Sequence, residues 1–235
     1  MLFYILALFI GLSVCDDGNP FQMPPGLTIR KCRQKGTVAI TIDDGPKGGM
    51  IPVLKLLDKK EYRSHKVTFF VTGKSMDEMG KNDSTFLMKM ALRRGHEVGH
   101  HSYEHKSYVD LSHDEMKADF LKMDAKLGKI KGTSKIFRPP YGYIKQSVFD
   151  FIRSQNYHII GWTQDTNDWK YYDKDDYVQK VMKELNEEVK KKSIVLMHDN
   201  DAKSAEVLEK ILKLVDKAGY KSTTVSKCLG IDKEK

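Results

Sequence analysis

Runs of β-branched and aromatic residues alternate with segments of helical periodicity along most of the chain. Residues 50–60 repeat apolar positions at the spacing of one helix face, and residues 112–128 begin with a capping-box pattern, Ser112 with Glu115. The pattern predicts seven strands, at residues 37–43, 66–73, 97–102, 135–142, 157–165, 193–199 and 220–226. It predicts six helices, at residues 50–60, 84–95, 112–128, 146–155, 175–192 and 204–219.

This alternation predicts the fold class. Each of the first six predicted strands is followed by a predicted helix, and β/α alternation is typical of a parallel sheet. The chain has 235 residues, a length that suits one α/β barrel. We therefore expect a single α/β domain, a distorted (β/α) barrel of about seven parallel strands.

The N-terminal residues favour export. Residues 1–15 are almost wholly apolar and give way to acidic residues, and Ser13 and Cys15 supply small side chains before a cleavage point. This pattern predicts a signal peptide over 1–15, with an uncleaved anchor as the alternative. We expect a secreted, extracellular protein that a cell wall could retain, with an N-terminal segment at 16–35 and a tail at 231–235.

Cysteine usage agrees with an oxidising compartment. Loss of the signal peptide leaves Cys32 and Cys228, an even pair that predicts one disulfide between the two ends of the domain. Asn82 begins an Asn-Asp-Ser sequon and is a glycosylation candidate if the chain is exported.

Composition and charge narrow the class of partner. Apolar residues make up 40% of the chain, which is enough for a full core. The 40 Lys and Arg exceed the 32 Asp and Glu, for a net charge of +8. The lysines are scattered along the sequence, so we interpret them as a solvated surface, with an anionic surface or polymer as the alternative partner. The sequence lacks the interleaved basic and aromatic residues typical of nucleic-acid binding, so we expect no nucleic-acid partner. We expect the protein to be a monomer.

Chemistry-bearing residues follow five of the predicted strands. In a β/α barrel the carboxyl ends of the strands form one face, and active sites lie there. Five strand ends with charged or imidazole groups therefore predict an active site. The residues are Asp43 and Asp44, His100 and His101, Arg138 and Tyr141, Asp165 and Asp168, and His198 and Asp199.

Five short motifs at these strand ends resemble those of the polysaccharide deacetylases, the carbohydrate esterase family 4 or NodB-type domain that includes chitin deacetylases. They are TIDDGP at 41–46, HSYEH at 101–105, RPPYG at 138–142, DTNDW at 165–169 and LMH at 196–198. The resemblance covers about residues 36–230, which we take as the domain. It implies a distorted β/α barrel, in agreement with the predicted strands.

The resemblance implies a metal site. Asp44, His101 and His105 match the family's ligands, and two imidazoles plus a carboxylate make a divalent site with open positions. Because the histidines are four apart, one helical turn would place both on one side, whereas strand alternation would turn His100 away. We expect one divalent ion, with zinc the best match and cobalt or manganese as alternatives.

The resemblance also assigns catalytic roles. Asp43 would be the base, and Arg138, facing it, would favour its ionised form. Asp168 would hold Arg138, and His198 would be the general acid. The backbone N–H of Tyr141 would stabilise the oxyanion.

Two side chains complete the implied substrate pocket: Leu196 would receive the acetyl methyl group, and Trp169, together with the Tyr141 ring, would offer aromatic faces to a sugar. The resulting hypothesis is a metal-dependent de-N-acetylase of N-acetylglucosamine polymers. The alternatives are a catalytically silent relative that binds a wall glycan and an O-acetyl esterase acting on another polysaccharide.

Overall fold

The computed structural model describes residues 26–231. The predicted signal peptide and most of the predicted tail lie outside the described residues. All strand pairs are parallel, in the order β5-β4-β3-β2-β1-β7-β6, and β8 also pairs with β1. The strands are β1 (Thr37–Gly45), β2 (Val67–Val71), β3 (Glu97–His100), β4 (Ile136–Phe137), β5 (His158–Ile159), β6 (Gln164–Asp165), β7 (Ile194–His198) and β8 (Lys221–Thr223).

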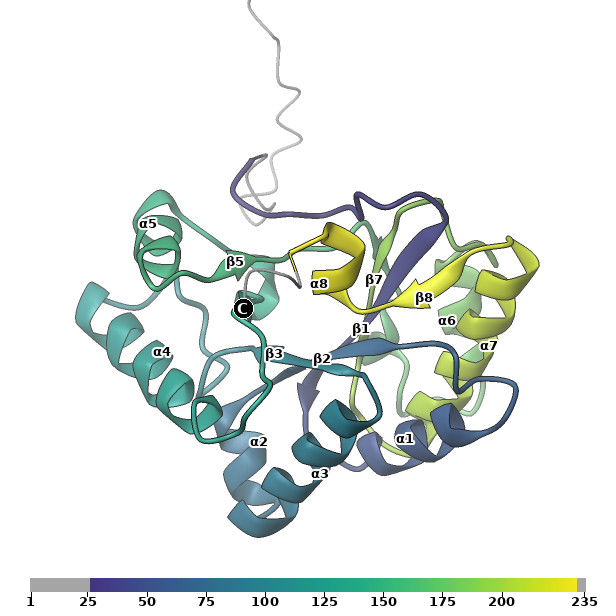
Figure 1. Cartoon of the computed structure of the whole chain (residues 1–235), viewed down its shortest axis with the longest axis horizontal. Helices are drawn as coiled ribbons and strands as arrows, with labels where there is room; N and C mark the ends of the chain where they lie inside the picture. The colour runs from purple at the N-terminus through teal and green to yellow at the C-terminus, as the bar shows by residue number, and fades with distance from the viewer. Residues whose placement is uncertain (1–25, 232–235) are drawn as a thin grey trace, which may run out of the picture.

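Helices surround the strands (Figure 1). The predicted capping box begins α4, where the Ser112 side chain accepts from the backbone N–H of Glu115. The helices are α1 (Met50–Asp58), α2 (Gly73–Glu78), α3 (Lys81–Arg93), α4 (His113–Leu127), α5 (Gln146–Ser154), α6 (Tyr177–Glu184), α7 (Lys203–Lys217) and α8 (Val225–Leu229). Two 3₁₀ turns, η1 (Pro140–Gly142) and η2 (Asp168–Lys170), follow β4 and β6.

The sheet curls into a half-barrel, which confirms the predicted fold class. One predicted strand, residues 157–165, is instead two short strands, β5 and β6. The first pairs with β4 and the second with β7, at opposite edges of the sheet, so one straight strand cannot make both pairings. Between these edges lies the N-terminal segment, where Ile29 bridges Ile160 and Lys31 bridges Ser193.

Side chains alternate between the two faces of the curled sheet. On β1, Val38, Ile40 and Ile42 belong to the core that packs against the outer helices. Ala39 belongs to the barrel interior together with Phe70, Ile136 and Ile194, from β2, β4 and β7. Val225, Cys228 and Leu229 of α8 close this interior at the amino ends of the strands.

The two predicted cysteine partners are joined. Cys32 and Cys228 form a disulfide across 196 residues of sequence and tie the N-terminal segment to α8. Asn82 is exposed on the first turn of α3. Within residues 26–231, no helix is both long and apolar enough to span a membrane.

Candidate active site

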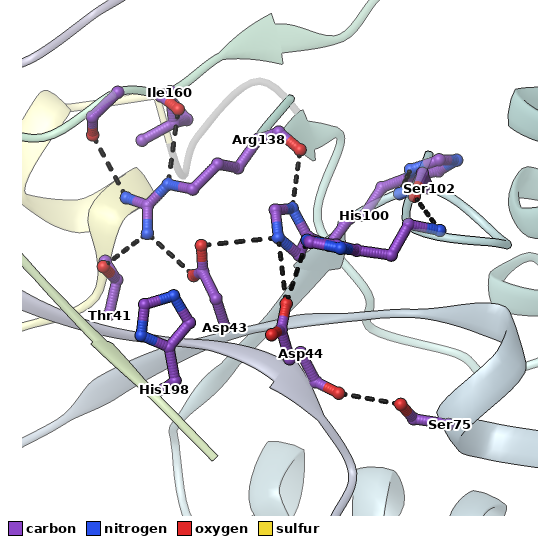
Figure 2. A network of polar contacts seen from close by, with 12 residues as sticks. Thr41, Asp43, Asp44, Ser75, His100, Ser102, Arg138, Ile160 and His198 are labelled. Carbon is purple, nitrogen blue, oxygen red and sulfur yellow. Dashed lines mark hydrogen bonds and ion pairs between the residues drawn. The ribbon is translucent and has the colours of Figure 1, made fainter. Parts of the chain in front are cut away.

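A pocket of about 470 Å³ lies at the carboxyl ends of the strands. Its wall includes eight of the ten residues to which the family resemblance assigned a role: Asp43, Asp44, His101, His105, Tyr141, Trp169, Leu196 and His198. The other two, Arg138 and Asp168, are fully buried behind this wall and contact residues that line it. Figure 2 shows Asp43 between the guanidinium of Arg138 and the imidazoles near Asp44.

A β-bulge at the end of β1 directs both adjacent acids into the pocket. Successive residues of a regular strand point to opposite faces, so Asp43 and Asp44 would normally diverge. The pairing of β1 with β2 shifts register between Asp43 and Gly45, and Asp44 has a left-handed backbone with φ of 70°. The Ser75 hydroxyl, on α2, donates to the carbonyl of Asp44 at 2.8 Å and holds this conformation.

A loop, and not a helical turn, brings His101 and His105 together. Residues 101–112 contain no helix, and Ser102 and His105 have positive φ values of 69° and 56°. The Ser102 hydroxyl accepts from the backbone N–H of His105 at 3.0 Å and closes the turn. His100 points away as predicted, because its ring stacks on Phe120 outside the pocket.

The imidazoles converge on one oxygen of Asp44. His101 Nδ1 lies 2.7 Å from the carbonyl oxygen of Arg138, which can only accept, so Nδ1 carries the proton. The other ring nitrogen, Nε2, faces Asp44 Oδ1 at 3.3 Å. His105 Nε2 lies 3.1 Å from the same oxygen.

These three groups fit a divalent metal ion. Their ligand atoms lie within 4.8 Å of one another, and the buried Asp44 Oδ1 accepts no hydrogen bond from the described residues. Burial alone raises the pKa of Asp44, but the imidazoles of His101 and His105 lower it well below its usual value. Burial, together with His101, lowers the pKa of His105 to about 4. A carboxylate and neutral imidazoles suit zinc-type ions.

Arg138 is held rigidly inside the barrel. Its Nη1 donates to Asp43 Oδ1 at 2.8 Å and to Thr41 Oγ1 at 2.6 Å. The other side-chain nitrogens donate to the carbonyl oxygens of Ile160 at 3.4 Å and Gly161 at 3.1 Å. Every guanidinium nitrogen thus has a partner, which fixes the charge beside Asp43.

Asp168 pairs with His198 and not with Arg138, so the predicted tether was wrong. Asp168 Oδ1 lies 2.6 Å from His198 Nδ1, and Oδ2 accepts the backbone N–H of His198 at 2.7 Å. The fully buried Asp168 begins η2 beside β7, whereas Arg138 turns into the barrel toward β1. Burial lowers the pKa of His198, but the hydrogen bond and charge of Asp168 outweigh it and raise the pKa to about 9.

Aromatic side chains form the mouth of the pocket. Tyr141 and Trp169 are 56% and 54% exposed as whole residues, so both could contact a ligand without unfolding any core. Tyr141 packs beside His105 with ring centroids 4.8 Å apart. Leu196 is buried in the pocket wall. The Tyr141 N–H has no backbone acceptor within residues 26–231, whereas those of Gly142 and Tyr143 do.

Asp119, on α4, is a site-supporting residue that the sequence reading missed. Its two carboxylate oxygens accept the backbone N–H groups of Tyr103 at 2.8 Å and Glu104 at 2.9 Å. It also accepts the hydroxyl of Tyr108 at 2.7 Å. Asp119 thereby holds the loop between His101 and His105. The available signal was an acid on the apolar face of the predicted helix, three residues after Met116.

Asp199 similarly supports the loop after β1. Its Oδ2 accepts the backbone N–H of Lys47 at 2.6 Å. A Cβ atom at Gly45 or Gly49 would lie 2.7 or 2.6 Å from this carboxylate, so the glycines allow the close approach. Burial, opposed by backbone N–H donors including Lys47, raises the pKa of Asp199 to about 6.

The pocket combines a buried carboxylate, an imidazole paired with a carboxylate, and three side chains that could bind a metal ion. This combination is typical of hydrolases that use a metal ion. A family model described as polysaccharide deacetylase matches residues 30–160, more than half of the chain. A peptidoglycan-N-acetylglucosamine deacetylase of Bacillus cereus is 34% identical over 198 residues, covering 82% of this chain and 87% of the relative. This chain therefore belongs to the polysaccharide deacetylase family.

Solved structures agree with this assignment. The chitin deacetylase of the fungal pathogen Colletotrichum lindemuthianum has a TM-score of 0.80 and 27% identity, covering 88% of this chain and 93% of that one. A structure described as a CE4 family pseudoenzyme from Bacillus anthracis has a TM-score of 0.71 and 27% identity, covering 87% of this chain and 69% of that one. The fold is thus shared by a protein described as a chitin deacetylase and by one described as a pseudoenzyme, so the side chains of the site distinguish the two.

Proposed function

We propose that this protein is a metal-dependent deacetylase that hydrolyses the acetamide groups of N-acetylglucosamine polymers and releases acetate. The observation that carries this proposal is the position of Asp43. It lies beside the metal-type site of Asp44, His101 and His105, and it contacts a buried arginine that has no other carboxylate partner among the described residues. The named relatives act on chitin or peptidoglycan N-acetylglucosamine, which supports this substrate class.

Asp44, His101 and His105 would hold the ion, for which zinc is the best match and cobalt or manganese are alternatives. When bound, the ion would polarise the amide carbonyl and acidify a water molecule. Asp43 would accept a proton from the attacking water. Arg138 supports this role because its hydrogen bond fixes one carboxylate oxygen, Oδ1, and leaves Oδ2 to accept the proton.

His198 would protonate the departing amine. Its Nδ1 is directed to Asp168, so the proton for the amine would come from Nε2. The raised pKa keeps the ring protonated at neutral pH, as a general acid requires. Asp168 would act through His198 by fixing its orientation and charge.

The Tyr141 N–H would donate to the developing oxyanion, because the described residues leave it without a backbone acceptor. Leu196 would receive the acetyl methyl group, and the exposed rings of Trp169 and Tyr141 would contact the sugar. The Cys32–Cys228 disulfide and the apolar N-terminus together support a secreted protein that a cell wall could retain, with a monomer as the expected state.

Acetate release from chitin oligomers and from peptidoglycan fragments tests the proposal. Purified protein should contain about one divalent ion per chain, and a chelator should abolish acetate release until metal is restored. Release from acetylated xylan but from neither amide substrate would instead identify an O-acetyl esterase. Bound metal without turnover on any of these substrates would identify a silent, glycan-binding relative.

A further inference from the structure

The excess positive charge gathers on the face opposite the pocket. We call this the amino-end face and define it by four segments that lead into β1, β2, β4 and β7. These segments, residues 26–36, 59–66, 128–135 and 185–193, contain fourteen Lys or Arg and three acidic residues. The segments on the pocket side, which follow the strands, contain six Lys or Arg and eight acidic residues. They are residues 46–49, 101–112, 138–145, 166–176 and 199–202.

Backbone contacts show that three of these segments, residues 26–36, 59–66 and 185–193, are joined directly or through β8. Cys32 N–H donates to the carbonyl of Lys192 at 2.9 Å, so the first segment runs beside the last. Lys221, the first residue of β8, donates to Gly36 at 2.9 Å, and Lys66 donates to Ser222 at 3.2 Å. The parallel sheet collects cations that are scattered along the sequence.

Most of these charges lack a counter-ion. Among residues 26–231, Lys135 is the only Lys or Arg of the four segments in an ion pair, 2.7 Å from Asp124. Burial lowers the pKa of Lys66, and the charge of the neighbouring Lys221 lowers it as well, while Asp58 raises it. A hollow of about 730 Å³ on the same face is lined by Lys131, Lys135 and Arg153. Uncompensated charge of one sign attracts polyanions.

We propose that the amino-end face binds an anionic polysaccharide, one that carries carboxylate or phosphate groups. This contact would hold the enzyme on the polymer, with the pocket on the opposite face left open to its substrate. The inference concerns a second surface, so it holds whether or not the pocket hydrolyses N-acetyl groups.

The chemistry of the face favours a polysaccharide over a membrane or nucleic acid. The large apolar side chains that are exposed within residues 26–231 lie on α1, α3, α4, η1 and residues 169–172, outside the four segments. Among the described residues, the amino-end face therefore has neither large exposed apolar side chains that could insert into lipid nor exposed aromatic rings on which bases could stack. Lysine and arginine tips can follow a hydrated, flexible polyanion without either feature.

Binding of fluorescent polygalacturonate to the full-length protein, measured at low and physiological salt, tests the inference. The variant Lys31→Glu/Lys131→Glu/Lys191→Glu should bind at least about tenfold more weakly. The control Lys145→Glu/Lys174→Glu/Lys203→Glu has the same net charge but alters the opposite face, and it should stay within about twofold of wild type. Wild-type affinity should fall as salt rises.

Several results would overturn the inference. Equal losses of affinity in both triple variants would show that net charge alone is responsible for binding. Absence of binding by the wild-type protein would exclude anionic polysaccharides as the partner. Tighter binding to phosphatidylserine vesicles or to duplex DNA would replace the polysaccharide with that partner. If the Glu variant melts early, Lys31→Gln/Lys131→Gln/Lys191→Gln serves instead, and unchanged affinity there contradicts the proposal.

Discussion

Asp43 and Asp44 are adjacent in sequence and both lie near His101, yet their main partners differ. Asp43 is 2% exposed and contacts Arg138 through Oδ1, whereas Asp44 presents Oδ1 to the imidazoles of His101 and His105. The bulge lets both carboxylates line one pocket while each keeps its own partners, so one acid can hold metal while the other moves a proton.

Substitution of each acid by its amide should separate these tasks. Asp44→Asn should lose bound metal and activity together, because a ligand charge is removed. Asp43→Asn should keep the metal and slow acetate release by about a hundredfold to ten-thousandfold, the usual cost of losing a general base. Metal content and acetate release, measured on the same preparations, check both outcomes. Loss of metal from Asp43→Asn with retention in Asp44→Asn would show that the roles are reversed.

Asp168→Asn should change the pH dependence of the reaction. The carboxylate raises the pKa of His198 against the effect of burial, to about 9, so the wild-type rate should fall as pH rises through that value. Without this charge the pKa falls, and the alkaline limb of the kcat profile should move to lower pH. Metal content should stay at the wild-type level. An unmoved limb with reduced kcat would contradict the proposed action of Asp168 on His198.

At the scale of elements, the loop between His101 and His105 depends on α2 and α4. Tyr103 packs against Gly73 so closely that a Cβ there would lie 2.1 Å from the ring. Its hydroxyl donates to Asp77, and Lys122 lies 3.5 Å from the ring centroid. Asp119 fixes the loop backbone. These contacts stabilise the left-handed conformations that turn both imidazoles toward Asp44.

Asp119→Asn should weaken metal binding by about tenfold to a hundredfold, because an amide cannot accept two backbone N–H groups as the carboxylate does. Asp124→Asn is the matched control on the same helix, since Asp124 accepts from Lys135 and contacts Tyr157 away from the loop. Chelator competition gives the affinity, and melting of the metal-free proteins separates loop positioning from general stability. Equal affinities in the two variants would assign Asp119 a purely structural role.

At the scale of the whole molecule, distant segments close the amino end of the half-barrel. The Cys32–Cys228 disulfide fastens the N-terminal segment to α8, whose apolar side chains fill the barrel interior. The same segment donates from Arg33 and Gln34 to the carbonyl of Cys228. The fold is thus cross-linked at the end opposite the pocket.

Cys32→Ser/Cys228→Ser should lower the free energy of unfolding, by up to about 5 kcal/mol if loop-closure entropy dominates. Denaturant unfolding of the variant and of wild type measures the difference, and wild type in reductant should match the variant. Peptide mapping without reductant that recovers both residues as free thiols would contradict the disulfide itself.

The sequence by itself determined most of the order of strands and helices, and the strand ends that carry the chemistry. It missed the short helices α2 and α8, and the helix predicted over 175–192 ends at Glu184. Apolar periodicity and glycine or capping signals are local, so they predict the parallel α/β architecture directly. Parallel strands share one carboxyl end, so the predicted strands also placed Asp43, His101, Arg138 and His198 at one face. The motifs then indicated the family.

Only the tertiary structure decided which polar groups meet. Asp168 is paired with His198, and residues 157–165 are divided between two sheet edges, because each pairing joins elements distant in sequence. The bulge at Asp44 and the left-handed turn at His105 depend on contacts from α2 and α4, which no local pattern specifies. Scattered lysines become one charged face because a parallel sheet places every loop that precedes a strand at the same end.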